Sequence, residues 1–141
     1  MSEVLFSKEI MQCIKMAGSI TKAAIIDCFI TDNKLIFVVE KGQIGLALGP
    51  KAKNLERLRN RFKKSIKFVE YDDNKEKFLV NLFKPYKTKS IDFEENGESV
   101  IAKVTVELSD KSKIIGKGGK NIEVIRELAR RHHSIKDVQI K

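Results

Sequence analysis

A short segment of this chain occurs twice, and this repetition constrains the fold more than any other feature of the sequence. When the two copies are aligned, residues 48–58 (LGPKAKNLERL) lie over residues 115–125 (IGKGGKNIEVI). The pairs that then coincide are glycine at 49/116, lysine at 53/120, asparagine at 54/121, glutamate at 56/123, and apolar residues at 48/115, 55/122 and 58/125. Such self-similarity indicates two copies of one structural unit rather than one larger domain.

The first copy has the following predicted elements. Apolar spacing and turn residues predict a helix at 7–16 with Ser7 as N-cap, strands at 24–31 and 35–40 joined at Asp32-Asn33, a glycine-punctuated segment at 42–49, a helix at 53–64 and a strand at 66–70. The residues expected on inner helix faces are Ile10, Ile14 and Ala17, then Leu55, Leu58 and Phe62.

The second copy has matching predicted elements. They are a helix at 75–83 that Pro85 stops, strands at 90–94 and 100–108 joined at Asn96-Gly97, a short helix capped by Ser109 or Asp110 that ends near Ile115, a helix at 120–132 and a strand at 137–140. In the helix at 120–132 the inner face holds Ile122, Ile125, Leu128 and Ala129. Each copy is therefore expected to run helix, strand, strand, helix, glycine loop, helix, strand.

Charge supports the same division into two domains, 1–72 and 73–141. The chain has 141 residues, a net charge of +9 and a pI of about 9.6. The first half carries 13 basic and 8 acidic residues, and the second half carries 15 and 11. Excess positive charge attracts phosphate polyanions. Two basic halves suit two similar binding units better than one domain with a basic tail.

The run Gly116-Lys117-Gly118-Gly119 is the motif with the clearest chemistry. It precedes a helix, whose N-terminus offers unpaired N–H groups and a partial positive charge. Glycines let a sugar-phosphate backbone approach closely. Glycines that serve only a tight helix–helix turn are the alternative, and a lone GxxG does not distinguish the two. The second copy and the flanking elements favour a loop that binds a nucleic acid backbone.

Other chemistry has little support in the sequence. No Walker A motif is present, and GxGxxG lacks its third glycine. The adjacent His132 and His133 are expected to contact C-terminal carbonyls or water rather than a metal ion. The cluster Glu94, Glu95 and Glu98 is interpreted as a solvated hairpin tip. We therefore expect no enzyme, and no cofactor, metal ion or small-molecule substrate.

Features that report on location favour the cytoplasm. Cys13 and Cys28 form no CxxC pair, which is typical of a reducing compartment. The N-terminus lacks the basic region and apolar run of a signal peptide. No apolar stretch approaches the length that spans a bilayer, so no membrane association is expected.

The segment IIGKGGKNIEVI (114–125) resembles the loop and flanking helices of a KH domain. Only nine residues follow the helix at 120–132, enough for one strand, so the order of elements resembles the type II form. The stretches 45–58 (GLALGPKAKNLERL) and 70–85 (EYDDNKEKFLVNLFKP) resemble the tandem KH unit of the archaeal NusA-like factors. The resemblance covers nearly the whole chain. It implies an α+β fold of two tandem type II KH domains, each a three-stranded sheet packed by helices.

The resemblance also implies a function. It implies a factor that binds single-stranded nascent RNA in a groove beside each glycine loop and acts in transcription termination and elongation. RNA polymerase is a further partner that it implies. Two alternatives stay open: a KH-type RNA-binding adaptor in the ribosome or in RNA processing, and a protein-interaction module that has lost RNA binding.

Candidate RNA-binding residues follow from the match to the GxxG motif. In the second loop they are Gly116, Lys117, Gly118 and Gly119, followed by Lys120; in the first they are Gly49, Pro50, Lys51 and Ala52, followed by Lys53, Arg57 and Arg61. The first loop has fewer donors, because Pro50 lacks an N–H, and its last position carries a methyl group, on Ala52. We therefore expect the first site to bind more weakly or to depend more on its basic side chains.

Overall fold

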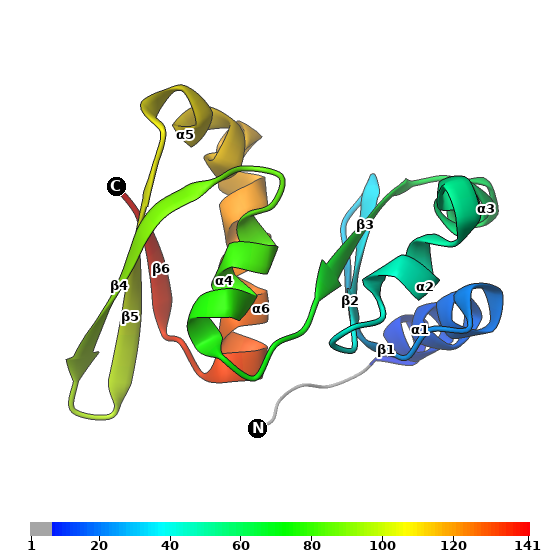
Figure 1. The fold of residues 1–141 in the computed structure, drawn as a ribbon, viewed down its shortest axis with the longest axis horizontal. Helices are drawn as coiled ribbons and strands as arrows, with labels where there is room; N and C mark the ends of the chain where they lie inside the picture. The colour runs from blue at the N-terminus through cyan, green and yellow to red at the C-terminus, as the bar shows by residue number, and fades with distance from the viewer. Residues whose placement is uncertain (1–6) are drawn as a thin grey trace. The chain divides into compact units, whose positions relative to one another are not determined.

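The computed structural model describes residues 7–141, and the chain divides into two compact units, Met1–Asp72 and Asp73–Lys141. Figure 1 colours the first unit from blue to green and the second from green to red. Each unit contains a three-stranded sheet with helices packed on it. The predicted α+β fold is confirmed.

The first unit has the expected order of elements. They are α1 (Lys8–Thr21), β1 (Ile25–Ile30), β2 (Lys34–Val39), α2 (Ile44–Leu48), a 3₁₀ turn (Pro50–Ala52), α3 (Lys53–Phe62) and β3 (Ser65–Glu70). The second unit repeats this order. Its elements are α4 (Lys75–Phe83), β4 (Thr88–Asn96), β5 (Ser99–Val106), α5 (Leu108–Ile115), a 3₁₀ turn (Lys117–Gly119), α6 (Lys120–His133) and β6 (Asp137–Ile140).

The two sheets share one topology. The sheet orders are β1-β2-β3 and β4-β5-β6, with the first pair of strands antiparallel and the second pair parallel in each. A parallel neighbour cannot be reached by a hairpin and needs a crossover connection. In both units that crossover consists of a short helix, the glycine loop and a longer helix, so each loop is built into the connection that completes the sheet.

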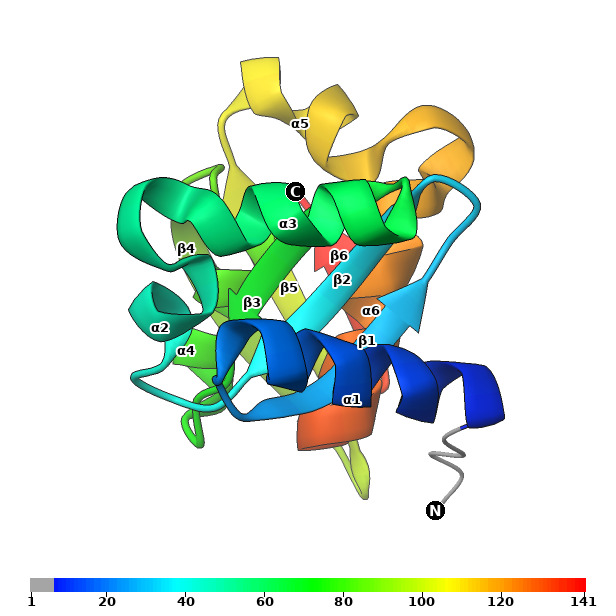
Figure 2. The same cartoon turned by 90° about the vertical axis from the view of Figure 1, so that its right-hand side faces the viewer.

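Helices α1 and α3 lie side by side across one face of the first sheet (Figure 2). The core beneath them is built from Ala17, Cys28, Leu35, Phe37, Leu58 and Ile66. The residues predicted for the inner helix faces all belong to this core or pack against it: Ile10, Ile14, Ala17, Leu55, Leu58 and Phe62. The N-cap prediction is also confirmed, because the Ile10 N–H donates to Ser7 Oγ at 3.1 Å.

In the second unit, α4 and α6 pack together (Figure 1). The four inner residues predicted for α6 are its buried residues: Ile122, Ile125, Leu128 and Ala129. Alternate residues of β5 are buried in the same way: Ala102, Val104 and Val106. The period of 3.6 in the helix and of 2 in the strand places both sets in the core.

Two helices of the first unit differ from the prediction. Helix α1 continues beyond residue 16 to Thr21, whose hydroxyl donates to the Ala17 carbonyl at 2.7 Å. Ala17 is buried and Ile20 packs on the core, so tertiary contacts outweigh the weak helix propensity of Gly18 and Ser19. Residues 44–48 form α2 despite Gly45, because this helix buries Ala47 completely.

The start of α5 also corrects the prediction. Neither Ser109 nor Asp110 caps it, since the helix begins at Leu108 after Glu107. The ladder between β4 and β5 ends where Thr88 pairs with Val106. The chain is therefore released from the sheet two residues earlier than expected, and the helix starts at once.

Leu58→Ala should lower the free energy of unfolding of the first unit by about 2–5 kcal/mol, because it opens a cavity under a fully buried side chain. The matched control is Leu46→Ala, which truncates a leucine that is 51% exposed and should change stability by less than about 0.5 kcal/mol. Hydrogen exchange of the β2 amides measures both. Equal losses from the two variants would contradict this account of the core.

Candidate nucleic-acid interface

The two glycine loops adopt one backbone conformation. The three pairs of residues at positive φ are Gly49 and Gly116 at 75° and 80°, Lys51 and Gly118 at 54° and 65°, and Ala52 and Gly119 at 57° and 75°. Residues that align in the sequence repeat therefore also have similar φ angles.

The cost of this conformation differs between the loops. Positive φ is accessible to glycine but costs an L-residue roughly 1–2 kcal/mol. The second loop has glycine at all three positions. The first loop holds Lys51 and Ala52 there, so its backbone is strained. The first unit keeps the same turn with residues that do not favour it.

Amide N–H groups of the second loop are open to a ligand. The Gly116 N–H donates to the Ser112 carbonyl at 2.9 Å, and the Gly119 N–H donates to the Gly116 carbonyl at 3.0 Å. The N–H groups of Lys117 and Gly118 donate to no other backbone group within residues 7–141. Two successive donors are thus available just before the N-terminus of the 14-residue helix α6, and no side chain caps that end of the helix.

The first loop offers one donor in the same place. The Gly49 N–H donates to the Gly45 carbonyl, and the Ala52 N–H donates to the Gly49 carbonyl, each at 3.0 Å. Pro50 has no N–H, so only the Lys51 amide corresponds to the two open amides of the second loop.

Basic side chains surround both loops to different degrees. Lys117 and Lys120 are exposed at the second loop, and Lys51 and Lys53 at the first. Arg57 stays near the loop, since its Nη1 is 3.4 Å from Asn54 Oδ1.

Arg61 and Lys64 are used elsewhere in the first unit. The Arg61 Nε donates to the Met16 sulfur at 2.9 Å, so this side chain is directed to α1 rather than to the loop. The Lys64 ammonium donates to the Thr31 carbonyl at 2.9 Å. Of the basic residues predicted for the first site, the structure brings Lys51, Lys53 and Arg57 to the loop.

The surface next to the first loop is apolar. Leu46 lies one helical turn before Gly49 and is 51% exposed. Lys113 occupies the equivalent place in the second unit, so the two loops have different neighbours. The first offers a contact to an apolar group such as a base face, and the second offers another positive charge.

Two asparagines that sequence reasoning left without a role lie behind the loops. Asn54 Nδ2 is 3.2 Å from the Leu46 carbonyl, and Asn121 Nδ2 is 3.1 Å from the Lys113 carbonyl. Both asparagines align in the sequence repeat, which was the only signal for them. The repeat does not indicate which atoms they contact.

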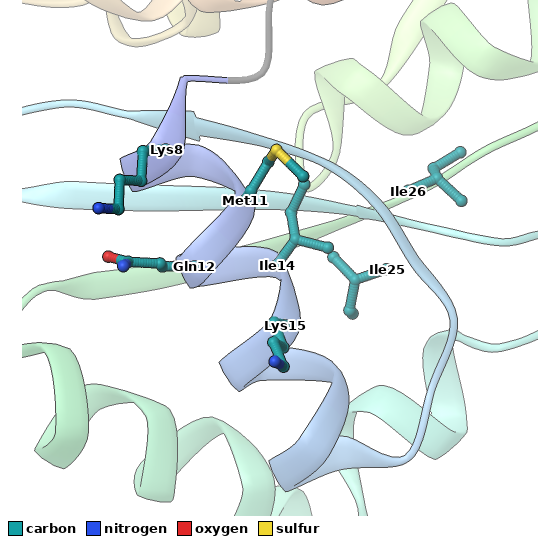
Figure 3. A pocket seen from close by; sticks show the side chains of 7 residues that line it. All are labelled: Lys8, Met11, Gln12, Ile14, Lys15, Ile25 and Ile26. Atoms are coloured by element: carbon teal, nitrogen blue, oxygen red, sulfur yellow. The ribbon is translucent and has the colours of Figure 1, made fainter.

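A pocket of about 700 Å³ lies elsewhere in the first unit, at α1 and the start of β1 (Figure 3). Its lining residues are Lys8, Met11, Gln12, Ile14, Lys15, Ile25 and Ile26. The pocket contains no residue of either glycine loop, so it is not the predicted RNA groove.

His132 and His133 make a contact that was not predicted. Their ring centroids lie 5.6 and 5.3 Å from that of Phe78, so both rings pack against this side chain of α4. The expectation of contacts to carbonyls or water did not include these ring contacts. Within residues 7–141, no group of three or more histidine, cysteine, aspartate or glutamate side chains is placed to hold a metal ion.

Hydrogen bonds and burial shift the pKa values of four side chains among the described residues. Burial raises the pKa of the Cys13 thiol. At the hairpin tip, hydrogen bonds from Lys103 and Asn96 lower the pKa of Glu94. On α6, hydrogen bonding to Arg130 lowers the pKa of Glu127. Burial, together with the charge of Lys34, lowers the pKa of Lys67 to about 8.

The part of the chain that the structure describes has no helix with the length and hydropathy needed to cross a bilayer.

Ala52→Gly should raise the free energy of unfolding by roughly 0.5–1 kcal/mol, because relief of the cost at positive φ outweighs the extra backbone freedom of glycine. Gly119→Ala is the reciprocal change and should lower it by a similar amount. A Cβ at Gly119 would meet only Ile122 Cγ2 at 4.0 Å, so its cost comes from φ and not from a clash. Urea unfolding followed by circular dichroism measures both variants. A loss of stability in Ala52→Gly would contradict the assignment of backbone strain to Ala52.

Comparison with known proteins matches both units. A family model described as the NusA-like second KH domain matches residues 75–140, and one described as the KH domain matches residues 12–84. The probable transcription termination protein NusA of Halobacterium salinarum is 31% identical over 137 residues, which cover 97% of this chain and 98% of that protein. The protein of the same name from Methanocaldococcus jannaschii is 26% identical over 140 residues, which cover 99% and 76%.

A solved structure gives the same result for the fold. The crystal structure of APE1850 matches with a TM-score of 0.79 and 31% sequence identity, over 96% of this chain and 99% of that chain. The similarity therefore extends over both units and both loops.

Proposed function

We propose that this chain, which belongs to the family of NusA-like KH proteins, binds single-stranded RNA through its two glycine loops and acts on nascent RNA in the control of transcription termination and elongation. The relatives are named as probable transcription termination proteins, which supports a role in transcription termination. Action at transcribing RNA polymerase in the cytoplasm is part of the same proposal. No catalytic step is part of this function.

The observation that carries the proposal is the pair of open amides at Lys117 and Gly118. They stand at the N-terminus of α6, where the helix dipole adds a partial positive charge. A Cβ at Gly118 would meet nothing within 4 Å, so the backbone there is accessible. A phosphate oxygen can accept from both amides while Lys117 and Lys120 balance its charge.

Single strands are the form of RNA that suits these loops. Loop amides and lysines grip the backbone, and an unstacked base can then turn toward the protein. Beside the first loop, the exposed Leu46 offers such a base an apolar surface. A duplex keeps its bases stacked and paired, so it would gain only the contacts to phosphate.

The preference for single strands can be measured directly. Single-stranded RNA should bind at least roughly tenfold more tightly than a perfect RNA duplex of the same length at physiological salt, because only the single strand gains contacts to its bases. Fluorescence anisotropy with labelled oligonucleotides measures both affinities. Equal affinities would leave only a general attraction to phosphate. Failure to bind either form would favour the alternative of a protein-interaction module.

The two loops should contribute unequally to binding. Lys117→Asp with Gly118→Asp should weaken single-strand binding more than Pro50→Asp with Lys51→Asp, with a loss of roughly tenfold or more for the first pair. The two double variants are matched, because each replaces one lysine and one uncharged residue by aspartate and so changes the net charge by the same amount. The second loop has more to lose, since it has two open amides and the first has one.

Circular dichroism checks that both double variants remain folded. Gly118→Asp introduces an L-residue at a φ of 65°, a local cost of roughly 1–2 kcal/mol that the rest of the unit should tolerate. A larger loss from the first-loop pair would reverse the ranking. Two folded variants that bind like the parent would overturn the assignment of RNA to these loops.

A further inference from the structure

The first glycine of each loop makes room for an asparagine. A Cβ built on Gly49 would lie 2.7 Å from Asn54 Nδ2, and one built on Gly116 would lie 2.8 Å from Asn121 Nδ2. Contacts below 3 Å are not tolerated between such atoms, so any other residue would displace the asparagine. By contrast, nothing lies within 4 Å of a Cβ built on Gly118. The space beside Gly116 is thus filled by Asn121, whereas the space beside Gly118 is open to a ligand.

Each asparagine links the two helices that the loop separates. Asn121 stands in the first turn of α6, and its amide donates to the Lys113 carbonyl in the last turn of α5 at 3.1 Å. Asn54 stands in the first turn of α3, and its amide donates to the Leu46 carbonyl of α2 at 3.2 Å. The hydrogen bond spans eight residues and closes the turn behind the open amides.

Comparison of the two copies shows that the glycine–asparagine pair is the same in both loops, while the three residues after the glycine are not. Between the two copies, all three residues that follow the first glycine differ: Pro50, Lys51 and Ala52 against Lys117, Gly118 and Gly119. The first glycine and the asparagine are identical, and both hydrogen bonds are formed. Asparagine is suited to this place because it combines a short side chain with an N–H donor, whereas aspartate has no donor and glutamine is one carbon longer.

We infer that Asn54 and Asn121 are positioning residues that hold the loop amides in the arrangement that receives a phosphate. This inference rests on the proposed RNA-binding function. Asn54 is only 7% exposed, so it acts on RNA through the loop and not by touching it. Asn121 is exposed but makes the same hydrogen bond, so its test must separate an effect through the loop from direct contact with RNA. The hydrogen bond from the asparagine amide fixes the last turn of the preceding helix against the first turn of the next. The N–H groups between the two helices then point in a fixed direction.

The test compares Asn121→Ala with Gln139→Ala, which removes an amide side chain from an exposed position on β6. Asn121→Ala should bind single-stranded RNA about tenfold more weakly, the size that loss of one hydrogen bond produces. The NMR order parameters of the Lys117 and Gly118 amides should fall in the free protein, because the loop loses the hydrogen bond that fixes it, while those in the core of β5 stay as in the parent. Gln139→Ala should change neither the affinity nor these order parameters.

A double-mutant cycle distinguishes positioning from general stabilisation. Asn121→Ala is combined with the Lys117→Asp and Gly118→Asp pair. If the asparagine acts through the loop, its loss should matter much less once the loop contacts are gone, so the effects should be less than additive. Additive effects, or loop amides whose order parameters stay as in the parent, would overturn the inference. If the parent binds no single-stranded RNA, the proposed function fails, and the order parameters of Lys117 and Gly118 still decide whether Asn121 fixes the loop.

Discussion

The parallel pairing of the second and third strands in each unit is the constraint on which the rest of the structure depends. Strand β3 can lie parallel to β2 only if the chain returns along the length of the sheet, and two helices make that return. The helices must then meet within a turn of four residues. The backbone solves this with three residues at positive φ, and it does so in the same way in both units. The candidate RNA site is therefore a consequence of how the sheet is closed.

This origin explains why a weakly specific sequence motif carries a specific geometry. A short turn between two helices leaves the second helix without a side-chain cap, as at Gly119 before α6. Uncapped helix ends expose N–H groups that need an acceptor. In a packing turn these donors would be satisfied by side chains or water. Here the amides of Lys117 and Gly118 stay at the surface next to lysines, an arrangement that suits the phosphate oxygens of the proposed ligand.

Much of this fold can be predicted from the sequence, because its elements show clear periods and clear ends. Helix α4 begins and ends where predicted, at Lys75 and Phe83, since Asn74 caps its start and Pro85 follows its end. Strand β6 also has its predicted bounds. The match to the NusA-like family, inferred first from the two loops, is confirmed by the comparisons over nearly the whole chain.

The features that could not be predicted depend on contacts between residues far apart or on dihedral angles. The bounds of helix α2, which the repeat predicted only by its place in the order, depend on the burial of Ala47. The direction of Arg61 is set by Met16, which is 45 residues away in the chain. The strain at Ala52 is invisible until φ is known. The role of the asparagines needed the distance to a backbone carbonyl, although their repetition had marked them.

The two units are alike in backbone and unlike in ligand-facing chemistry, and this difference bears on how a tandem protein binds a strand. The second loop has more donors and relaxed glycines, whereas the first has a strained backbone, one open amide and the exposed Leu46. Only residues 71–74 separate β3 from α4. Under the proposed function, a strand held by one unit would meet the other at high effective concentration, so that even a weak second contact would add to the affinity. The first loop would then not need to bind tightly by itself, which would permit Pro50 and Ala52 where the second loop has lysine and glycine.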